Sequence, residues 1–367
     1  MKIFSLSSCT PLSSYEIKTM NDLKKDIRKL ALKDIEADLI ERGEPRFRVG
    51  QVWEWLWKKG ARSFDDMTNL PKQVRQALDE RFTINAITED KVQRSLDGTI
   101  KTRFRLYDGH AIESVLIPVP EEQRFTVCVS CQVGCSLTCK FCATGQMKRV
   151  RNLDAAEIYD QVVLVNRQSE ETFGRPLTNI VYMGMGEPLL AYSSVLASIE
   201  RITADDGLGM SPKRITVSTA GIAKMIGKLA DDKVKFNLAL SLHAATDEKR
   251  NEIMPINEQN NLPVLMDAIA YFYRKTRNRI SFEYIAFQHF NDSIEDARQL
   301  LKWCRRFPVM VNIIEYNPVD GVRFHKSSED QIDRFAQFLR DHDVMVTVRR
   351  SRGKDIDAAC GQLANKG

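Results

Sequence analysis

The sequence lacks any apolar run that approaches the roughly 20 residues needed to cross a bilayer as a helix. Its opening segment, MKIFSLSSC, contains too short an apolar stretch for a secretory signal. These absences argue against a membrane-spanning or exported protein. We therefore expect a cytoplasmic protein with no membrane partner.

The sequence also has little excess of charge of either sign. Its 54 lysines and arginines face 49 acidic residues, which gives a net charge of +5. The first hundred residues carry 18 basic and 16 acidic side chains, so they do not form a polycationic arm. This mildly basic balance permits a nucleic-acid partner without requiring one. A hydrophobic content of 43% and a length of 367 residues fit a soluble chain with one large domain and a smaller one.

The eight cysteines are the most informative part of the composition. Because nothing in the sequence indicates export, clustered cysteines here are more often metal ligands or reactive thiols than disulfides. We expect Cys304 to belong to the core and Cys9 to be incidental, and Cys360 lies near the end of the chain. The other five fall within fifteen residues: Cys128, Cys131, Cys135, Cys139 and Cys142.

The first part of the chain predicts a small helical domain. Residues 1–20 are rich in serine, have no period, and are expected to form a flexible lead-in. Residues 21–90 predict an accessory domain with helices over 22–40, around Trp53–Trp57 and over 71–82. Its three clustered tryptophans are expected to be core and interface anchors, because tryptophan is usually largely buried.

The rest of the chain predicts an α/β fold. Residues 91–124 alternate polar and apolar positions around a hairpin signal at Asp108-Gly109, and predict a β linker. Residues 125–350 contain six strands, each followed by a helix, which indicates parallel βα units in a partial (βα)6 barrel similar to a TIM barrel. The strands are expected over 125–133, 179–185, 214–221, 236–242, 280–287 and 309–316, with a seventh over 344–350 before the tail, 351–367.

Polar and reactive residues follow these strands at their carboxyl ends. In barrel folds the chemistry lies at that edge, so these residues are expected to share one site. They are the cysteine loop, Gly184–Pro188, Ser218, Ser241–His243 and Asn317.

The cysteine loop has the spacing C-x3-C-x2-C at Cys135, Cys139 and Cys142. Three thiolates on a four-iron cluster would leave one iron open to bind a small molecule. The alternative is zinc held by Cys128, Cys131, Cys139 and Cys142. We favour the cluster, because the first two of these cysteines lie in a predicted strand and would point to opposite faces.

This loop, with Phe141 before its last cysteine, resembles the signature of the radical S-adenosylmethionine (SAM) superfamily. The resemblance implies a [4Fe–4S] cluster on Cys135, Cys139 and Cys142, and reductive cleavage of SAM to a 5′-deoxyadenosyl radical. Met183–Pro188 resembles the glycine-rich segment that meets the amino group of the cofactor. Glycines there would allow close backbone approach, and Glu187 would suit an ammonium group.

A narrower resemblance covers most of residues 22–365. The segments FRVGQVWEWLWKKGARSFDDMTNLPK, IESVLIP, VCVSCQVGCSLTCKFCATG, NIVYMGMGEPL, LALSLHAA, IIEYNPV and RRSRGKDIDAACGQL resemble adenine-C2 methyltransferases of 23S ribosomal RNA and often of transfer RNA, the RlmN type. The C8-methylating Cfr type is closely related and shares these motifs. Adenine C2 is electron-poor, so a radical suits it better than ordinary methyl transfer.

The resemblance implies specific roles for residues outside the cluster. Cys360 would take a methyl group from one SAM molecule, and a second SAM would generate the radical, which makes two per turnover. Cys128 would then release the methylated base by forming a disulfide with Cys360, and Glu113 would accept the C2 proton. Cofactor contacts are implied for Gly186, Glu187, Ser218, Ser241, Leu242, His243 and Asn317.

Two segments depart from the family pattern. Cys131 occupies a position where serine or threonine is expected, and this extra thiol leaves the identity of the resolving cysteine open. Residues 145–151 fit only loosely, and their basic character suits either phosphate contact or a solvated turn.

The implied partners are 23S rRNA, transfer RNA and an electron donor such as flavodoxin or ferredoxin, and we expect a monomer. Two other functions stay open: C8 methylation, and a non-catalytic metal-binding RNA module. An RNA-facing surface and a solvated helix face are both compatible with the basic residues of the accessory domain, Arg46, Arg48, Lys58, Lys59 and Arg62.

Overall fold

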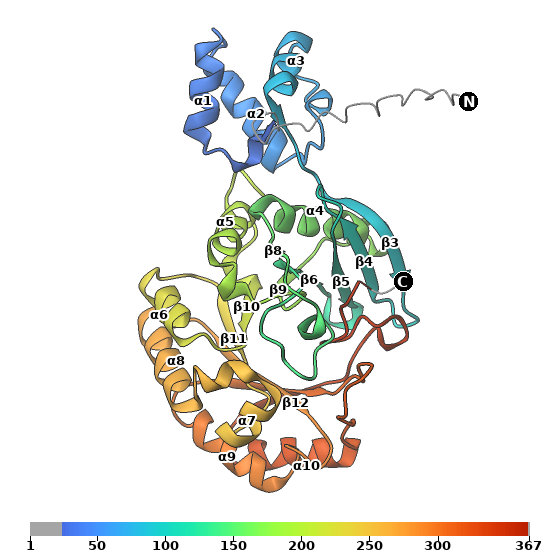
Figure 1. Ribbon diagram of the computed structural model, residues 1–367, viewed down its shortest axis with the longest axis vertical. Coiled ribbons are helices and arrows are strands. Elements are labelled where there is room, and N and C mark those ends of the chain that lie inside the picture. The colour runs from blue at the N-terminus through green and yellow to red at the C-terminus, as the bar shows by residue number, and fades with distance from the viewer. Residues whose placement is uncertain (1–23, 366–367) are drawn as a thin grey trace, which may run out of the picture.

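The computed structural model describes residues 24–365, so the predicted lead-in (1–20) lies outside the described residues. The chain begins with a small helical unit, at the top of Figure 1, that stands on a larger α/β unit. This small unit contains α1 (Leu32–Glu41), α2 (Phe47–Trp57) and α3 (Lys72–Arg81), with β1 (Lys25–Asp26) paired in parallel to β2 (Phe82–Thr83).

The helix predicted over 22–40 is wrong in its first half. Residues 27–29 form a 3-10 turn, and α1 begins only at Leu32. The carboxylate of Asp26 accepts hydrogen bonds from the backbone N–H groups of Arg28, at 3.0 Å, and Asn85, at 3.3 Å. These bonds and the pairing of β1 with β2 hold the backbone extended, so a tertiary contact overrides the helical period.

The tryptophans of α2 attach the helical unit to the α/β unit. Trp57 is buried, and its ring packs edge-on against Tyr159 with 5.3 Å between centroids. Trp53 is half-buried and donates its indole N–H to Asp206 at 2.8 Å, and Trp55 donates to Asn69 within the helical unit. Their prediction as core and interface anchors is confirmed.

The α/β unit is organised around one ten-stranded sheet within residues 24–365. Seven neighbouring strands run parallel: β6 (Arg124–Cys128), β9 (Asn179–Tyr182), β10 (Ile215–Thr219), β11 (Asn237–Ser241), β12 (Ile280–Ala286), β13 (Met310–Glu315) and β14 (Met345–Arg349). The sheet is open, because β14 at one edge does not pair with β3 at the other, which fits the predicted partial barrel.

The predicted β linker continues this sheet in antiparallel fashion. It consists of β3 (Thr88–Arg94), β4 (Ile100–Arg105) and β5 (Ala111–Val119), and Val115 of β5 pairs with Cys128 of β6. The predicted hairpin turn is confirmed: Gly109 has a φ of 82°, a backbone conformation that glycine adopts without steric cost.

Six helices follow the parallel strands as predicted: α4 (Ala155–Phe173), α5 (Tyr192–Thr203), α6 (Ala223–Asp231), α8 (Leu262–Thr276), α9 (Ile294–Cys304) and α10 (Glu329–Arg340). Figure 1 shows them on the outer side of the curved sheet. A short helix, α7 (Asp247–Ile253), was not predicted. It begins where the Thr246 side chain accepts a hydrogen bond from the N–H of Lys249.

The strand predicted over 125–133 is broken. β6 ends at Cys128, and the chain resumes as β7 (Gln132–Val133), which pairs with β8 (Arg151–Asn152) in a separate two-stranded ribbon. The break occurs because Ser130 is held by the side chain of Gln161, and the N–H of Cys131 turns to the carbonyl of Met185. Cys128 and Cys131 therefore do not share a strand, and our strand-based argument against zinc was wrong.

The segment after β14 returns across the open side of the sheet, and the described part of the predicted tail is residues 351–365. Where it begins, the buried carboxylate of Glu315 accepts hydrogen bonds from Arg350, at 3.0 Å, and from Lys354, at 2.8 Å. Farther on, the N–H of Gly353 donates to Asp97 in the β3–β4 turn, so the red tail lies against the teal strands in Figure 1.

Within residues 24–365, no helix combines the length and the apolarity that crossing a membrane requires.

Replacing Arg28 with alanine should destabilise the protein. Arg28 is buried and lies 2.7 Å from Asp160 of α4, so its loss leaves this carboxylate without its charged partner at the junction of the two units. We expect a loss of about 3 kcal/mol in the free energy of unfolding, measured by urea titration. Arg298→Ala, which removes an exposed ion pair with Glu295, should change it by less than about 0.5 kcal/mol. Equal effects of the two substitutions would contradict this prediction.

Glu315 should make stability depend on pH in the acid range. Burial alone would raise the pKa of this carboxyl, but hydrogen bonds from Lys354 and Arg350 outweigh burial and lower the pKa from 4.5 to about 2. The stabilisation is therefore full above pH 4.5 and is lost as the pH falls toward 2. In urea titrations between pH 6 and 3, Glu315→Gln should reduce the fall in the free energy of unfolding with decreasing pH. Substitution of the exposed Glu329 by glutamine should leave that fall unchanged. Parallel curves for wild type and Glu315→Gln would refute the assignment.

Candidate active site

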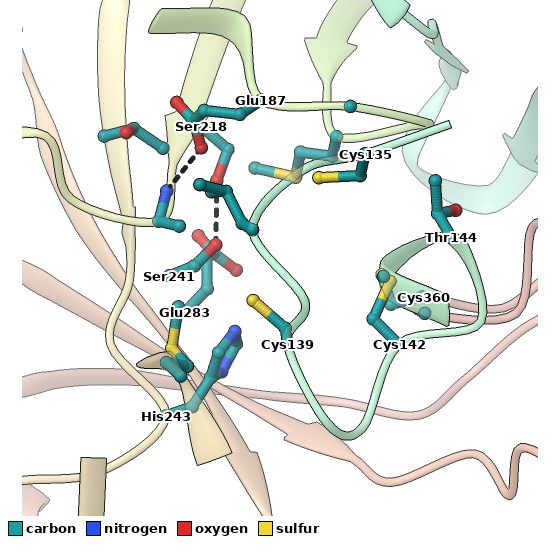
Figure 2. A pocket seen from close by; sticks show the side chains of 18 of the residues that line it. Cys135, Cys139, Cys142, Thr144, Glu187, Ser218, Ser241, His243, Glu283 and Cys360 are labelled. Carbon is teal, nitrogen blue, oxygen red and sulfur yellow. Dashed lines mark hydrogen bonds between the residues drawn. The ribbon is translucent and has the colours of Figure 1, made fainter. Parts of the chain in front are cut away.

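A recess opens at the carboxyl ends of the parallel strands, where the sequence predicted a shared site. Figure 2 shows its lining from strands and loops far apart in the chain. The predicted residues that line it are Cys135, Cys139, Cys142, Gly186, Glu187, Ser218, Ser241, His243 and Cys360. Four predicted residues are not among the lining: Glu113, Cys128, Leu242 and Asn317.

The cysteine loop starts at Gly134, which has a φ of 72° and lies directly against the backbone of Lys148. A Cβ at this position would be 2.3 Å from the carbonyl oxygen of Lys148, so only glycine fits. The loop is tied to α7 by a 3.0 Å hydrogen bond from the N–H of Lys140 to the carbonyl of Ile253. Figure 2 shows the Cys139 sulfur directed into the recess. These contacts give the loop a defined path around the recess.

Burial raises the pKa of all three loop thiols, to about 11 for Cys135 and to higher values than normal for Cys139 and Cys142. A cationic metal centre would favour their deprotonated form, since metal binding requires thiolates. Within the described residues, no three ligating side chains converge on one point as a single ion would need. The three cysteines instead surround a common space, which suits a group of several atoms.

The glycine-rich segment packs tightly beside this loop. A Cβ on Gly184 would come within 2.7 Å of Ser130 Oγ, and Gly186 has a φ of 99° with Gln132 directly beside it. Glu187 follows, and its buried carboxylate accepts a 2.8 Å hydrogen bond from the N–H of Ala220. Burial raises the pKa of Glu187, against the effect of its hydrogen bonds. The segment thus holds a carboxylate at the wall of the recess.

Hydroxyl groups from β10 and β11 and the imidazole of His243, just after β11, lie across the recess from the cysteine loop (Figure 2). Ser218 and Ser241 are hydrogen-bonded at 3.2 Å, and His243 has an unusual φ of 55°. The Nδ1 atom of His243 accepts the N–H of Ile285 at 3.1 Å, and burial together with Arg250 lowers the pKa of His243 to about 3. His243 is therefore neutral at physiological pH.

Leu242 and Asn317 lie behind the lining. The side chain of Leu242 is fully buried, and its N–H donates to the carbonyl of Glu283 at 3.0 Å. Asn317 is also buried, and its side-chain amide donates to Ser351 at 2.9 Å, at the base of the tail. The structure therefore places these two residues as supports of the recess wall.

Arg250, in the unpredicted helix α7, was missed as a site residue. Its fully buried guanidinium donates to the carbonyls of Ala220 at 2.6 Å, Leu242 at 3.1 Å and Ser241 at 3.2 Å, and to the side chain of Asn257 at 2.6 Å. It thereby ties together the ends of β10 and β11. No sequence signal marked it, because an arginine in a short charged helix resembles a solvated residue.

The same guanidinium contributes positive charge to the recess. Burial lowers the pKa of Arg250 to about 10, while the nearby Cys139 acts in the opposite direction. Within residues 24–365, Arg250 forms no ion pair with a carboxylate. A buried cation without a carboxylate partner favours an anionic group beside it, such as a set of thiolates.

The tail brings Cys360 to the mouth of the recess. The carbonyl of Gly361 accepts the N–H of Ala143 at 2.7 Å, and the carbonyl of Leu363 accepts the hydroxyl of Thr144 at 2.5 Å. Cys360 is exposed to solvent at the mouth, yet surrounding protein atoms raise the pKa of its thiol. Cys360 and Cys142 lie side by side in Figure 2, and the nearby Cys142 also raises the pKa of the Cys360 thiol.

Two further cysteines lie below the lining. Cys128 is buried at the end of β6, and both burial and the nearby Cys360 raise the pKa of its thiol. Cys131 is also buried, but the charged neighbours that raise its pKa are Glu187, Cys135 and Cys128. Of these two thiols, only Cys128 has Cys360 among the groups that raise its pKa.

Glu113, on β5, is buried away from the lining. Its carboxylate accepts hydrogen bonds from the N–H groups of Ala364, at 2.9 Å, and Asn365, at 3.1 Å, both in the tail. The structure thus brings Glu113 to the tail and not to the recess itself.

Two segments match known families. Residues 26–84 match the ribosomal RNA large subunit methyltransferase N-terminal domain, and residues 129–303 match the radical SAM superfamily. The second match covers the cysteine loop and the strands that line the recess. Together these matches favour an enzyme over a non-catalytic module, and a cluster over zinc.

Full-length relatives agree. "Probable dual-specificity RNA methyltransferase RlmN" of Cytophaga hutchinsonii is 54% identical over 96% of this chain and 95% of its own length. "Dual-specificity RNA methyltransferase RlmN" of Geotalea uraniireducens is 44% identical over 94% of this chain and 97% of its own length. A radical SAM methyltransferase crystal structure from Sphaerobacter thermophilus has a TM-score of 0.88 at 40% identity, covering 93% of this chain and 100% of that one.

Radical SAM proteins use a [4Fe–4S] cluster and SAM, and the recess fits both groups. Cys135, Cys139 and Cys142 surround the space for a cluster, the buried guanidinium of Arg250 acts electrostatically on Cys139, and Glu187 provides a carboxylate for an ammonium group. On the strength of its sequence, its fold and this recess, the chain belongs to the RlmN family of radical SAM methyltransferases.

Proposed function

We propose that the protein methylates C2 of adenine in 23S ribosomal RNA and in transfer RNA. The observation that carries this proposal is the position of Cys360, which the tail brings to the recess of the three loop cysteines. A thiol at that point can hold a methyl group within reach of chemistry at the cluster. The relatives bear the RlmN name, and no feature of the site favours C8 over C2.

The cofactors supply the reactive species, and the chain positions them. When bound, the cluster and SAM provide a 5′-deoxyadenosyl radical, and two SAM molecules are used per turnover. Cys135, Cys139 and Cys142 would hold the cluster as thiolates. Glu187 would accept hydrogen bonds from the amino group of SAM, and the hydroxyls of Ser218 and Ser241 would donate to its polar atoms.

The neutral His243 and the residues behind the lining have supporting roles in this proposal. Because Nδ1 of the neutral imidazole accepts the N–H of Ile285, the ring carries its proton on Nε2, which could donate a hydrogen bond to SAM. Leu242 and Asn317 would maintain the wall on which Ser241 and the tail rest. Gly186 would allow the backbone to approach the cofactor closely.

Cys360 and Cys128 act as a pair in this proposal. Cys360 carries the methyl-derived carbon that becomes attached to the base. The thiolate of Cys128 would then attack the sulfur of Cys360, so that an S–S bond forms while the carbon–sulfur bond to the base breaks. The electron pair of the broken bond stays on the carbon, which takes up a proton and becomes the methyl group. Glu113 is proposed to accept the proton from C2. A thiol donor system would return the disulfide to two thiols before the next turnover.

We propose that residues 21–90 form an accessory domain that faces RNA, ahead of a linker (91–124), a barrel (125–350) and a tail (351–367). Of its predicted basic residues, Arg48 and Arg62 donate to backbone carbonyls of Asn69 and Ile87 and are structural. Arg46 and Lys59 form surface ion pairs with Glu36, at 2.6 Å, and Glu54, at 3.5 Å. With the exposed Lys58, they would be the cations that contact phosphate at this surface. We further propose a cytoplasmic monomer that takes electrons from a flavodoxin or ferredoxin.

Regiochemistry is the direct test of the substrate proposal. The reconstituted enzyme, SAM and a reductant are incubated with 23S rRNA fragments and with transfer RNA, followed by nuclease digestion and mass spectrometry of the nucleosides. We expect 2-methyladenosine in both RNAs, because the full-length relatives are named dual-specificity RNA methyltransferases of the RlmN type. A product containing only 8-methyladenosine would overturn the proposal, and methylation of one RNA alone would restrict it.

Replacing Cys128 with alanine should trap protein on RNA. Without the thiol that attacks Cys360, the carbon–sulfur bond to the base cannot be broken, so labelled RNA should migrate with denatured protein. Cys131→Ala is the matched control, because it removes a second buried thiol from the same segment. The Cys131 thiol, unlike that of Cys128, does not have Cys360 among the groups that raise its pKa, so this variant should release product normally. Absence of the adduct from Cys128→Ala protein with full iron content would argue against the Cys360 pathway.

A further inference from the structure

A buried ion pair lies beneath the tail. Lys101 on β4 and Glu113 on β5 are 3% and 1% exposed, and Lys101 Nζ lies 3.5 Å from Glu113 Oε1. The two residues are diagonal neighbours on adjacent antiparallel strands, where Lys101 pairs with Val115 and Glu113 with Arg103. Their side chains therefore extend from the same face of the sheet toward the tail.

The pair contacts the tail on both sides of Cys360. Lys101 Nζ donates to the carbonyl of Asp357 at 3.2 Å, ahead of the cysteine. Glu113 Oε2 accepts the N–H groups of Ala364 and Asn365, after the cysteine. The loop that carries Cys360 is thus held at both ends by one lysine and one glutamate.

The energetics of burial couple this pair to the docked tail. Removing two charges from water costs more than their mutual attraction returns unless further hydrogen bonds satisfy them. Within residues 24–365, the side-chain hydrogen bonds of Glu113 and Lys101 all go to backbone atoms of the tail. Undocking the tail would leave both charges poorly satisfied, so the pair favours the docked position.

The opposite side of the same loop rests on the cysteine loop. Ala143 and Thr144 donate to the carbonyls of Gly361 and Leu363, directly after Cys360. The tail therefore lies between the metal-binding loop on one side and the Lys101–Glu113 pair on the other. Two independent sets of backbone contacts define the position of the Cys360 side chain.

We propose that Lys101 and Glu113 form a positioning pair that sets the register of the tail and so places Cys360 at the recess. The proposal rests on the proposed function for the role of Cys360, whereas the hold on the tail is a property of the protein alone. It also constrains Glu113: Oε2 receives two backbone hydrogen bonds and Oε1 faces Lys101. While the tail is docked, Oε2 is occupied, so Oε1 beside Lys101 is the oxygen of Glu113 that could accept a proton from a substrate.

Hydrogen exchange of the full-length protein without RNA tests the hold directly. In wild type, the amides of Ala364 and Asn365 should be protected. Glu113→Ala should raise their exchange rate about tenfold or more, as expected from losing hydrogen bonds to a charged group. Glu113→Gln keeps an amide oxygen as acceptor and should restore most of the protection. Lys101→Met should raise exchange across 357–365, and the control Lys91→Met, exposed on β3, should leave it unchanged.

Methyl transfer provides the second measurement. Intact-protein mass spectrometry reports the methyl group on Cys360, and nucleoside analysis reports the RNA product. Glu113→Ala and Lys101→Met should lower methylation of Cys360 about tenfold while thermal unfolding and iron content show an intact fold. Glu113→Gln should retain the methyl group on Cys360, and a loss of RNA product in this variant alone would then indicate proton transfer.

Two results would overturn the positioning pair. One is unchanged exchange at Ala364 and Asn365 in Glu113→Ala, whatever the RNA product. The other is normal Cys360 methylation in Lys101→Met. If wild type fails to methylate RNA while the exchange pattern is as expected, the proposed function fails and the positioning pair stands.

Discussion

The parallel pairing from β6 to β14 is the constraint on which the rest of the structure depends. Because these strands share one direction, every segment that follows them emerges at the same edge of the sheet. The cysteine loop, the glycine-rich segment and the serines of β10 and β11 meet there although they are far apart in the sequence. Arg250 stabilises this edge by joining the ends of β10 and β11 through their carbonyls.

The sequence predicted those features that local patterns encode. The barrel strands and their helices were identified because apolar residues recur with the period of each element, and the Asp108-Gly109 turn has its own composition. The motifs that form the recess were also identified, and nine of the predicted residues line it. These are the parts of the fold in which local preference and tertiary structure agree.

Features set by long-range contacts were not predicted. The helix expected near Ile27 gave way to a 3-10 turn, because a short strand pairs with Phe82–Thr83 far along the chain. The break after Cys128 depends on Gln161 and Met185, and the burial of Arg250 depends on three carbonyls from two strands. A pattern within one segment contains no information about such partners.

The tail gives the open sheet a feature that a closed barrel lacks. Where a closed barrel has another strand, this protein has a segment held by hydrogen bonds from two sides, and that segment carries the thiol at the mouth of the recess. The reactive group and the border of the entrance are thus one piece of chain. Access and reactivity are therefore coupled, because a movement of the tail shifts the border of the entrance and Cys360 together.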